Sequence, residues 1–258
     1  MKKIFLMGWL LLAASTRLLA YEINWVNKPD QIMPEARQHL TFNVGSAGVS
    51  LENIAGQVMQ MVVVDQSLDT YMHYFPVQGA DGNFSQDIVF PNEGQYLFFF
   101  YFQPKSGTPV TLRSTLDVGE VTDRFATVSM YFDTEQFTDD DMKVAFTVVP
   151  KDIKEKTETQ VTFAFIDGQS GQPVKDLQGY LQAAGELVMI NAAGKIYKQV
   201  PSVERMPEVV DPKKANKIFF GPWVNFQVSF PEKGIYKLWG EFRHRNKMII
   251  VPFMVWVK

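Results

Sequence analysis

The sequence predicts an all-β protein made of two tandem immunoglobulin-like β-sandwich domains related by internal duplication. Alternation of apolar and polar residues is the first indication, as in 224–230, where every second residue is Val or Phe. Turn signals such as Asp81-Gly82 and Asp167-Gly168 separate these runs, and convincing amphipathic helices are scarce. Many short strands at this spacing favour a sandwich.

A repeated motif is the strongest indication of duplication. Phe90–Tyr96 reads FPNEGQY, and Phe230–Tyr236 reads FPEKGIY. In each copy proline ends a strand, because it cannot donate to a sheet, and glycine supplies the turn. The tyrosine has two interpretations, a hydroxyl that bonds back to nearby backbone as in immunoglobulin-like folds, or simple core packing.

The segments upstream of this motif also align and set the domain limits. Leu40-Thr-Phe matches Val161-Thr-Phe, Gln60–Val64 matches Glu186–Ile190, and Pro76 matches Pro201. The strand-like run Thr127–Phe132 lies between the copies. We therefore expect four parts in chain order: a signal peptide (1–20), domain one (21–119), a linker (120–140), and domain two (141–258) with an insertion at about 207–223.

The N-terminus has the pattern of a secretory signal peptide. Lys2 and Lys3 precede an apolar run that is too short to span a membrane, and small residues end at Ala20, after which we expect cleavage. No second long apolar segment follows. The expected product is periplasmic or secreted, without a membrane span after cleavage.

Composition excludes several function classes. The chain has 25 basic and 28 acidic side chains, and three of the basic ones, Lys2, Lys3 and Arg17, lie in the leader. This acidic balance argues against nucleic acid as a partner. Cysteine is absent, which excludes a thiolate metal site, a cysteine nucleophile and a lipid-modified cysteine.

No catalytic residues are expected. The three histidines, His39, His73 and His244, are isolated in the sequence, and no Gly-x-Ser-x-Gly elbow is present. We expect His244 on a solvated hairpin. The sequence therefore predicts that the protein is not an enzyme.

The repeat resembles a family of small exported β-sandwich domains, some of them linked to copper or other heavy-metal handling. The family pattern ends in Phe-Pro-x-x-Gly-x-Tyr-x-x-Trp-x-x-Phe and Val-Pro-Phe-x-Val. The second copy follows it through Phe230, Tyr236, Trp239, Phe242 and 251–255. Asp176-Leu-Gln-Gly-Tyr-Leu resembles the segment before the family's first histidine.

Most of the family's histidines are missing from this chain. The resemblance implies three ligand positions in each copy, and His73 is the only histidine retained at them. Imidazole clusters bind transition metals because several neutral nitrogens converge on one ion. We therefore expect no intact metal site and no cofactor. The residues at the six positions are Gln60, His73 and Phe75 in the first copy, and Glu186, Lys198 and Val200 in the second.

An acidic stretch precedes domain two. Asp133, Glu135 and 139–141 offer the oxygen ligands that calcium prefers, but they lack the spacing of an EF-hand loop. A solvated linker is the favoured interpretation.

The insertion in domain two is the largest departure from the repeat. Its apolar and basic side chains either form a patch for a protein partner or fold over the sandwich and extend its core. Partner recognition specific to domain two would lie here, because loops on a rigid scaffold commonly carry function. The candidate partner-binding residues are Lys213, Lys214, Lys217, Phe219, Phe220 and Trp223.

Together these features predict an exported, non-catalytic binding or structural protein of the cell envelope that acts through its domain surfaces. The partner would be an unknown envelope protein or a small ligand. The alternative is a periplasmic metal-handling protein of the copper type, derived from the histidine-bearing family.

Overall fold

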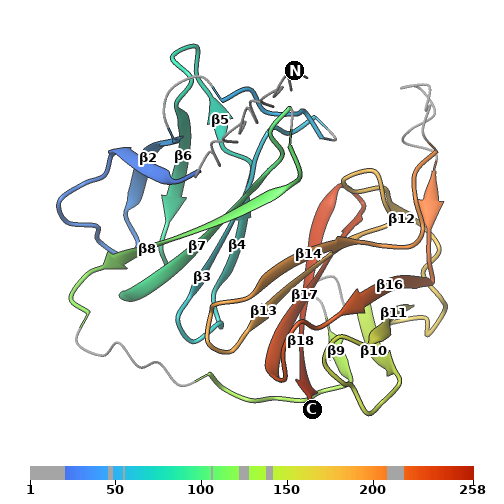
Figure 1. Ribbon diagram of the computed structural model, residues 1–258. Coiled ribbons are helices and arrows are strands. Elements are labelled where there is room, and N and C mark those ends of the chain that lie inside the picture. The colour runs from blue at the N-terminus through green and yellow to red at the C-terminus, as the bar shows by residue number, and fades with distance from the viewer. Residues whose placement is uncertain are drawn as a thin grey trace, which may run out of the picture.

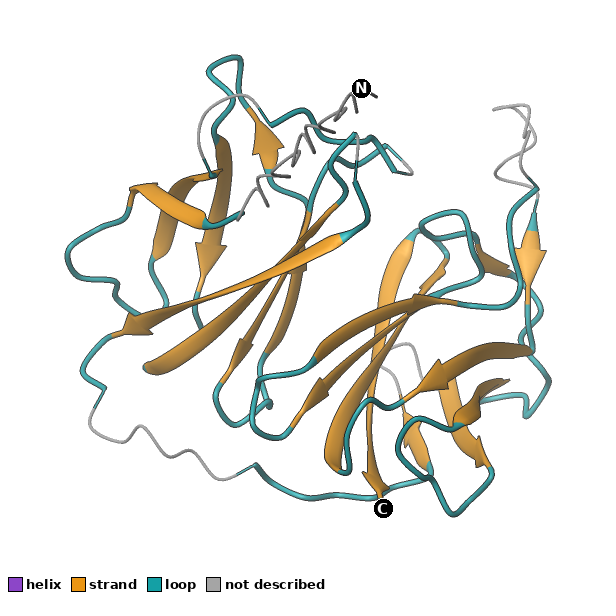
Figure 2. Ribbon diagram, in the orientation of Figure 1, coloured by secondary structure: helices purple, strands orange, loops and turns teal. Residues whose placement is uncertain are grey.

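The chain folds into two β-sandwiches, as the sequence predicts (Figure 1). The computed structural model describes residues 21–45, 49–54, 56–105, 107–121, 128–137, 142–207 and 218–258. Within these ranges the regular elements are all strands, joined by turns and loops (Figure 2). The expected signal peptide lies outside the described residues.

Domain one consists of two four-stranded antiparallel sheets. One sheet has the order β1-β2-β6-β5 and the other the order β4-β3-β7-β8. Alternation explains β2, where every second side chain enters the core and its neighbours face outward. The strands are β1 (Ile23–Asn27), β2 (Arg37–Val44), β3 (Gln60–Asp65), β4 (Tyr71–Tyr74), β5 (Val77–Gln78), β6 (Phe84–Val89), β7 (Gly94–Phe102) and β8 (Val110–Val118).

Domain two repeats this plan with additional strands. One sheet has the order β16-β11-β10-β9. The other has the order β14-β13-β17-β12-β15, and β18 also pairs with β17. The strands are β9 (Glu135–Phe137), β10 (Met142–Val149), β11 (Glu158–Asp167), β12 (Leu177–Gln178), β13 (Glu186–Asn191), β14 (Tyr197–Pro201), β15 (Phe219–Phe220), β16 (Trp223–Ser229), β17 (Gly234–His244) and β18 (Lys247–Val257).

The strand registers show that the two domains are copies of one another. Tyr96 on β7 lies opposite Asp65 on β3, and Tyr236 on β17 lies opposite Asn191 on β13. Both tyrosines are fully buried. The repeated motif therefore occupies the same place in each sandwich.

Both interpretations of the repeated tyrosine hold. The Tyr96 hydroxyl donates to the backbone oxygen of Asn92 at 3.1 Å, and the Tyr236 hydroxyl donates to that of Glu232 at 2.9 Å. Each ring also packs against the phenylalanine that opens its motif, Phe90 or Phe230.

The segment between the domains differs from a plain linker. β9 lies within 120–140, and it pairs with β10 of domain two. The strand-like run Thr127–Phe132 forms no strand in its described part, residues 128–132. Asp139, Asp140 and Asp141 lie outside the described residues, and Glu135 pairs with Lys143 at 2.7 Å.

Three apolar clusters hold the described chain together. Two of them lie between the sheets of the individual domains. The third joins side chains of both domains, and it defines the place of the candidate site.

Candidate functional site

The facing strands β3 and β13 are buried on both sides. Gln60–Val64 and Glu186–Ile190 are buried throughout, whereas a sheet with one solvated face alternates. One side of each strand contributes to the core of its own domain, and the other side meets the opposite domain (Figure 1). This interdomain core contains Val62, Val64, Leu68, Leu97, Phe99, Val188, Ile190 and Trp239.

Two stacked ring pairs relate the domains by an approximate two-fold axis. Tyr71 of β4 stacks on Trp239 of β17, and Tyr197 of β14 stacks on Phe99 of β7. Tyr71 lies opposite Val64 as Tyr197 lies opposite Ile190, so the two tyrosines are counterparts in the repeat, as are Phe99 and Trp239. The same face of each domain therefore contacts the other.

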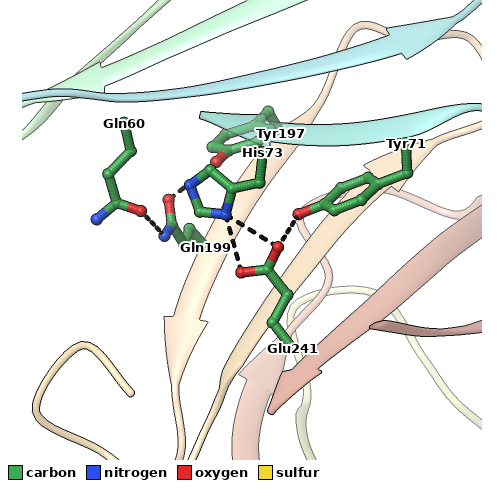
Figure 3. Close-up of polar contacts among 6 residues, drawn as sticks. All are labelled: Gln60, Tyr71, His73, Tyr197, Gln199 and Glu241. Atoms are coloured by element: carbon green, nitrogen blue, oxygen red, sulfur yellow. Dashed lines mark hydrogen bonds and ion pairs between the residues drawn. The ribbon is translucent and has the colours of Figure 1, made fainter. Parts of the chain in front are cut away.

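A buried polar group lies beside these rings. His73 Nδ1 is 2.9 Å from both carboxylate oxygens of Glu241, and the Tyr71 hydroxyl donates to Glu241 Oε1 at 2.8 Å (Figure 3). The side chains of His73 and Glu241 are only 4% and 1% exposed. We assign the imidazole proton to Nδ1, which then donates to the carboxylate oxygens. Nε2 is buried and has no partner among the described residues.

Two glutamines form a second polar contact across the interface. Gln199 Nε2 donates to Gln60 Oε1, and the Tyr197 hydroxyl donates to Gln199 Oε1 at 2.9 Å (Figure 3). The strand registers make Gln199 the counterpart of His73. This side of the two-fold axis thus carries neutral amides where the other side carries the His73–Glu241 pair.

The glutamine side opens into a pocket of about 380 Å³ between the domains. Pockets of about 300–1,000 Å³ with a few convergent polar groups are typical ligand sites. Domain one supplies Ile54, Gln60 and Tyr101, and domain two supplies Leu181, Gln182, Glu186, Gln199, Pro201, Arg205 and Met206.

Glu186 is the buried acid of this pocket, and the residue is only 5% exposed. Burial raises its pKa to about 8, with a further contribution from the Glu241 carboxylate. Arg205 and a hydrogen bond from Gln199 oppose this shift. The carboxyl of Glu186 is therefore mostly protonated at pH 7.

A tight turn forms part of the pocket wall. Leu181 and Gln182 have φ angles of 46° and 65°, and the flanking Tyr180 and Ala183 exchange backbone hydrogen bonds of 2.8 and 2.9 Å. Two consecutive residues with positive φ are typical of a two-residue hairpin turn of type I′, which usually contains Asn or Gly. Bulkier residues in this conformation indicate that the surrounding structure fixes the turn.

The structure corrects the predicted counterparts of His73 and Phe75. Gln199, not Lys198, lies opposite Val188 as His73 lies opposite Val62, so the predicted alignment is wrong by one residue. A one-residue shift moves a side chain to the other face of a sheet. Lys198 accordingly faces away from the interface, where its Nζ donates to the Ser229 carbonyl at 2.8 Å.

Val200 is displaced in the same way, since it packs against the core of domain two. Phe75 contacts the His73 ring at a centroid distance of 4.9 Å. Gln60 and Glu186 are counterparts as predicted, because they lie opposite Tyr101 and Glu241, respectively. The structure thus brings Gln60, His73 and Glu186 to one interface, with Phe75 against His73. Lys198 and Val200 face away from this interface.

The described part of the insertion is divided between core and surface. Phe220 packs against the core of domain two, while Phe219 and Trp223 are 51% and 63% exposed. Lys213, Lys214 and Lys217 lie outside the described residues.

The prediction of a solvated His244 is wrong. His244 does lie beside a hairpin turn, at the end of β17, but it is buried. Its Nε2 is 3.2 Å from an Asp176 oxygen. His39 is exposed and pairs with Asp87 at 2.7 Å.

No sequence pattern identifies Glu241, Tyr71, Tyr101, Arg205 or the turn as parts of a site. One signal was present in the sequence. The continuous apolar runs of β3 and β13 indicate that both faces are covered, and in a two-domain chain the other domain can cover the second face.

Fold and site together define a two-domain β-sandwich protein with a pocket between its domains. The chain belongs to the family described as Domain of unknown function (DUF8832), which matches residues 19–120 and 136–258. The family model thus matches twice, once in each domain. A search of curated proteins found no match. The described part of the chain contains no helix that could span a bilayer.

Several solved structures are similar to the chain at low identity. FdeC, an adhesin of Escherichia coli, is 14% identical over 92% of this chain and 64% of that chain, with a TM-score of 0.27. The fibronectin(III)-like modules of Clostridium thermocellum CbhA are 10% identical over 92% and 94%, with a TM-score of 0.25. A two-domain fibronectin type-III segment of chicken tenascin is 9% identical over 92% and 98%, with a TM-score of 0.23. These values are too low to say what this chain binds.

Proposed function

We propose that the protein is an exported, non-catalytic binding protein of the cell envelope that holds a small ligand between its two domains. The observation that carries this proposal is the interdomain pocket, into which polar side chains from both sandwiches converge. The apolar core beside the pocket supports the proposal, because it fixes the relative position of the domains and so preforms the pocket.

The chemistry of the lining supports binding. Gln60, Gln182 and Gln199 carry amides, which form hydrogen bonds and do not titrate. Arg205 supplies a permanent charge, and Glu186 is buried and mostly protonated at neutral pH. These groups are suited to orienting a polar ligand.

The test is a thermal-shift screen of the tag-free protein without residues 1–20. The panel contains sugars, amino acids, amines and carboxylic acids. A ligand that binds only the folded state raises the unfolding midpoint in proportion to its concentration and affinity. We expect one chemical class to do so.

Two tryptophan substitutions separate binding in the pocket from binding elsewhere. Ile54→Trp adds bulk to the pocket wall at a residue that is partly exposed, and Val77→Trp adds the same bulk on the exposed strand β5. The midpoint shift should disappear in Ile54→Trp and persist in Val77→Trp. A panel without any stabilising class, or a shift that survives Ile54→Trp, would refute the proposal.

Export is tested independently. The full chain is produced in a Gram-negative host, and the cell fractions are probed for the protein. We expect it outside the cytoplasm and shortened by about the length of the leader. Retention of the full-length chain in the cytoplasm would contradict the proposed location.

A further inference from the structure

We infer that the ligand of the interdomain pocket is a small organic carboxylate, paired with the Arg205 guanidinium and hydrogen-bonded by Gln60 and Tyr101. This inference rests on the proposed function, since it names the chemistry of the same pocket. Three properties of the lining carry it: charge, hydrogen-bonding capacity and apolar surface.

The charge of the lining is positive near neutral pH. Arg205 and Glu186 are the lining residues that normally carry charge. The guanidinium is always charged, and it has no hydrogen bond or ion pair to another described residue. Burial keeps the pKa of Glu186 at about 8 and raises the pKa of Tyr101, so both are mainly neutral at pH 7. Arg205 is exposed, and an anionic ligand would supply the counter-charge that it lacks among the described residues.

The lining offers more hydrogen-bond donors than acceptors. Gln60 Oε1 already accepts from Gln199, and Gln199 Oε1 accepts from Tyr197. The amide nitrogen of Gln60, the hydroxyl of Tyr101 and the guanidinium remain as donors. A protonated Glu186 adds another. A carboxylate has two oxygens that accept from several donors, and guanidinium groups bind it in a bidentate manner.

The remaining surface fits an organic skeleton with one charge. Ile54, Leu181, Pro201 and Met206 form apolar parts of the wall. A phosphate dianion would bring a second negative charge without a second cation in the lining, and burying an unpaired charge is unfavourable. A neutral sugar would gain nothing from the charge of the exposed guanidinium, whereas an anion would be attracted to it.

Isothermal titration of the tag-free protein at pH 7 tests the inference. The probes are propionate and benzoate, their neutral amides propionamide and benzamide, and inorganic phosphate. We expect at least one carboxylate to bind at least tenfold more tightly than its amide, and more tightly than phosphate.

Arg205→Gln should weaken this binding at least tenfold, and Arg205→Lys should weaken it less. Arg37→Gln is the control, because Arg37 is 78% exposed and lies on β2, in the sheet of domain one that does not contain Gln60 or Tyr101. Glu186→Gln should show the same affinity at pH 9 as at pH 7, because glutamine does not titrate. The native protein should bind more weakly at pH 9 than at pH 7, because ionised Glu186 then repels the anion.

The outcomes distinguish this inference from the proposed function. Another class of compound, such as an amide or phosphate, could bind in place of carboxylates and lose its binding in Ile54→Trp. This outcome would overturn the inference of a carboxylate and would leave the pocket as a ligand site. Carboxylate binding unaffected by Arg205→Gln would also overturn the inference. If no class binds, the proposed function fails as well.

Discussion

Tyr71 of domain one stacks on Trp239 of domain two, with ring centroids 4.7 Å apart and planes 21° from parallel. The counterpart stack of Phe99 and Tyr197 has a centroid distance of 4.9 Å and an angle of 15°. Each domain thus offers a tyrosine from one edge strand to an aromatic ring on the neighbouring domain. This reciprocity is the geometry of a two-fold dimer, in which one surface is complementary to itself.

The interdomain stacks lead to the first prediction. Trp239→Ala should lower the free energy of unfolding by about 3–5 kcal/mol, because it removes a large ring from a closed apolar cluster. Trp256→Ala is the matched control, since Trp256 is 63% exposed and exposed substitutions usually change stability by less than about 0.5 kcal/mol. Guanidinium unfolding followed by circular dichroism measures both. Equal effects would show that the stack contributes little.

The second prediction concerns the end of the insertion. Phe220→Ala should destabilise the protein by about 1.5–3 kcal/mol, because Phe220 packs against the core of domain two. Phe219→Ala and Trp223→Ala should each cost less than about 0.5 kcal/mol, because both side chains are exposed. Urea midpoints of the three variants provide the measurement. A large loss at all three positions would mean that the whole segment is core and cannot serve as a partner surface.

The third prediction concerns metals. Tag-free protein should not bind Cu(I), Cu(II) or Zn(II) with sub-micromolar affinity in isothermal titration. His73 Nδ1 is already engaged by Glu241, and one remaining imidazole nitrogen is too few for a tight transition-metal site. A tight, stoichiometric isotherm that His73→Ala abolishes would disprove this prediction and favour the alternative function in metal handling.

The fold could be predicted from the sequence because its determinants are local. Alternation sets which side chains enter the core, and the Phe-Pro-x-x-Gly-x-Tyr motif places Tyr96 and Tyr236 by turn geometry alone. Both copies carry these signals, so each supports the other.

The interdomain site was not predicted, because its residues come together through the packing of one domain on the other. His73 and Glu241 are far apart in the sequence, and nothing near either residue indicates its partner. The choice of Lys198 over Gln199 failed for a second reason. Aligning Pro76 with Pro201 ignores the register of the β13–β14 pair, and a shift of one residue exchanges the interface face for the core face.

The last prediction uses the ionisation of Glu186. Its folded-state pKa of about 8 lies above the ordinary value of 4.5, so the folded protein retains a proton that the unfolded chain releases. The unfolding free energy should therefore fall as the pH rises from about 4.5 to 8, by at most about 1.4 kcal/mol per pH unit from this group. Below this pH range Glu186 causes no loss of unfolding free energy, and above it the loss is complete.

Glu186→Gln isolates the contribution of Glu186 to the pH dependence of stability, because glutamine resembles the protonated acid and does not titrate. Urea unfolding between pH 5 and 9 should give a shallower decline for Glu186→Gln than for the native protein, and the variant should be the more stable of the two at pH 8. Glu158→Gln, at an exposed position of β11, should follow the native curve. The groups that act on Glu186, namely Glu241, Arg205 and Gln199, are unchanged in both variants, so the difference between the curves reports Glu186 itself. Parallel curves for native protein and Glu186→Gln would show that this carboxyl is ionised in the folded state at neutral pH, and would remove the neutral donor from the pocket.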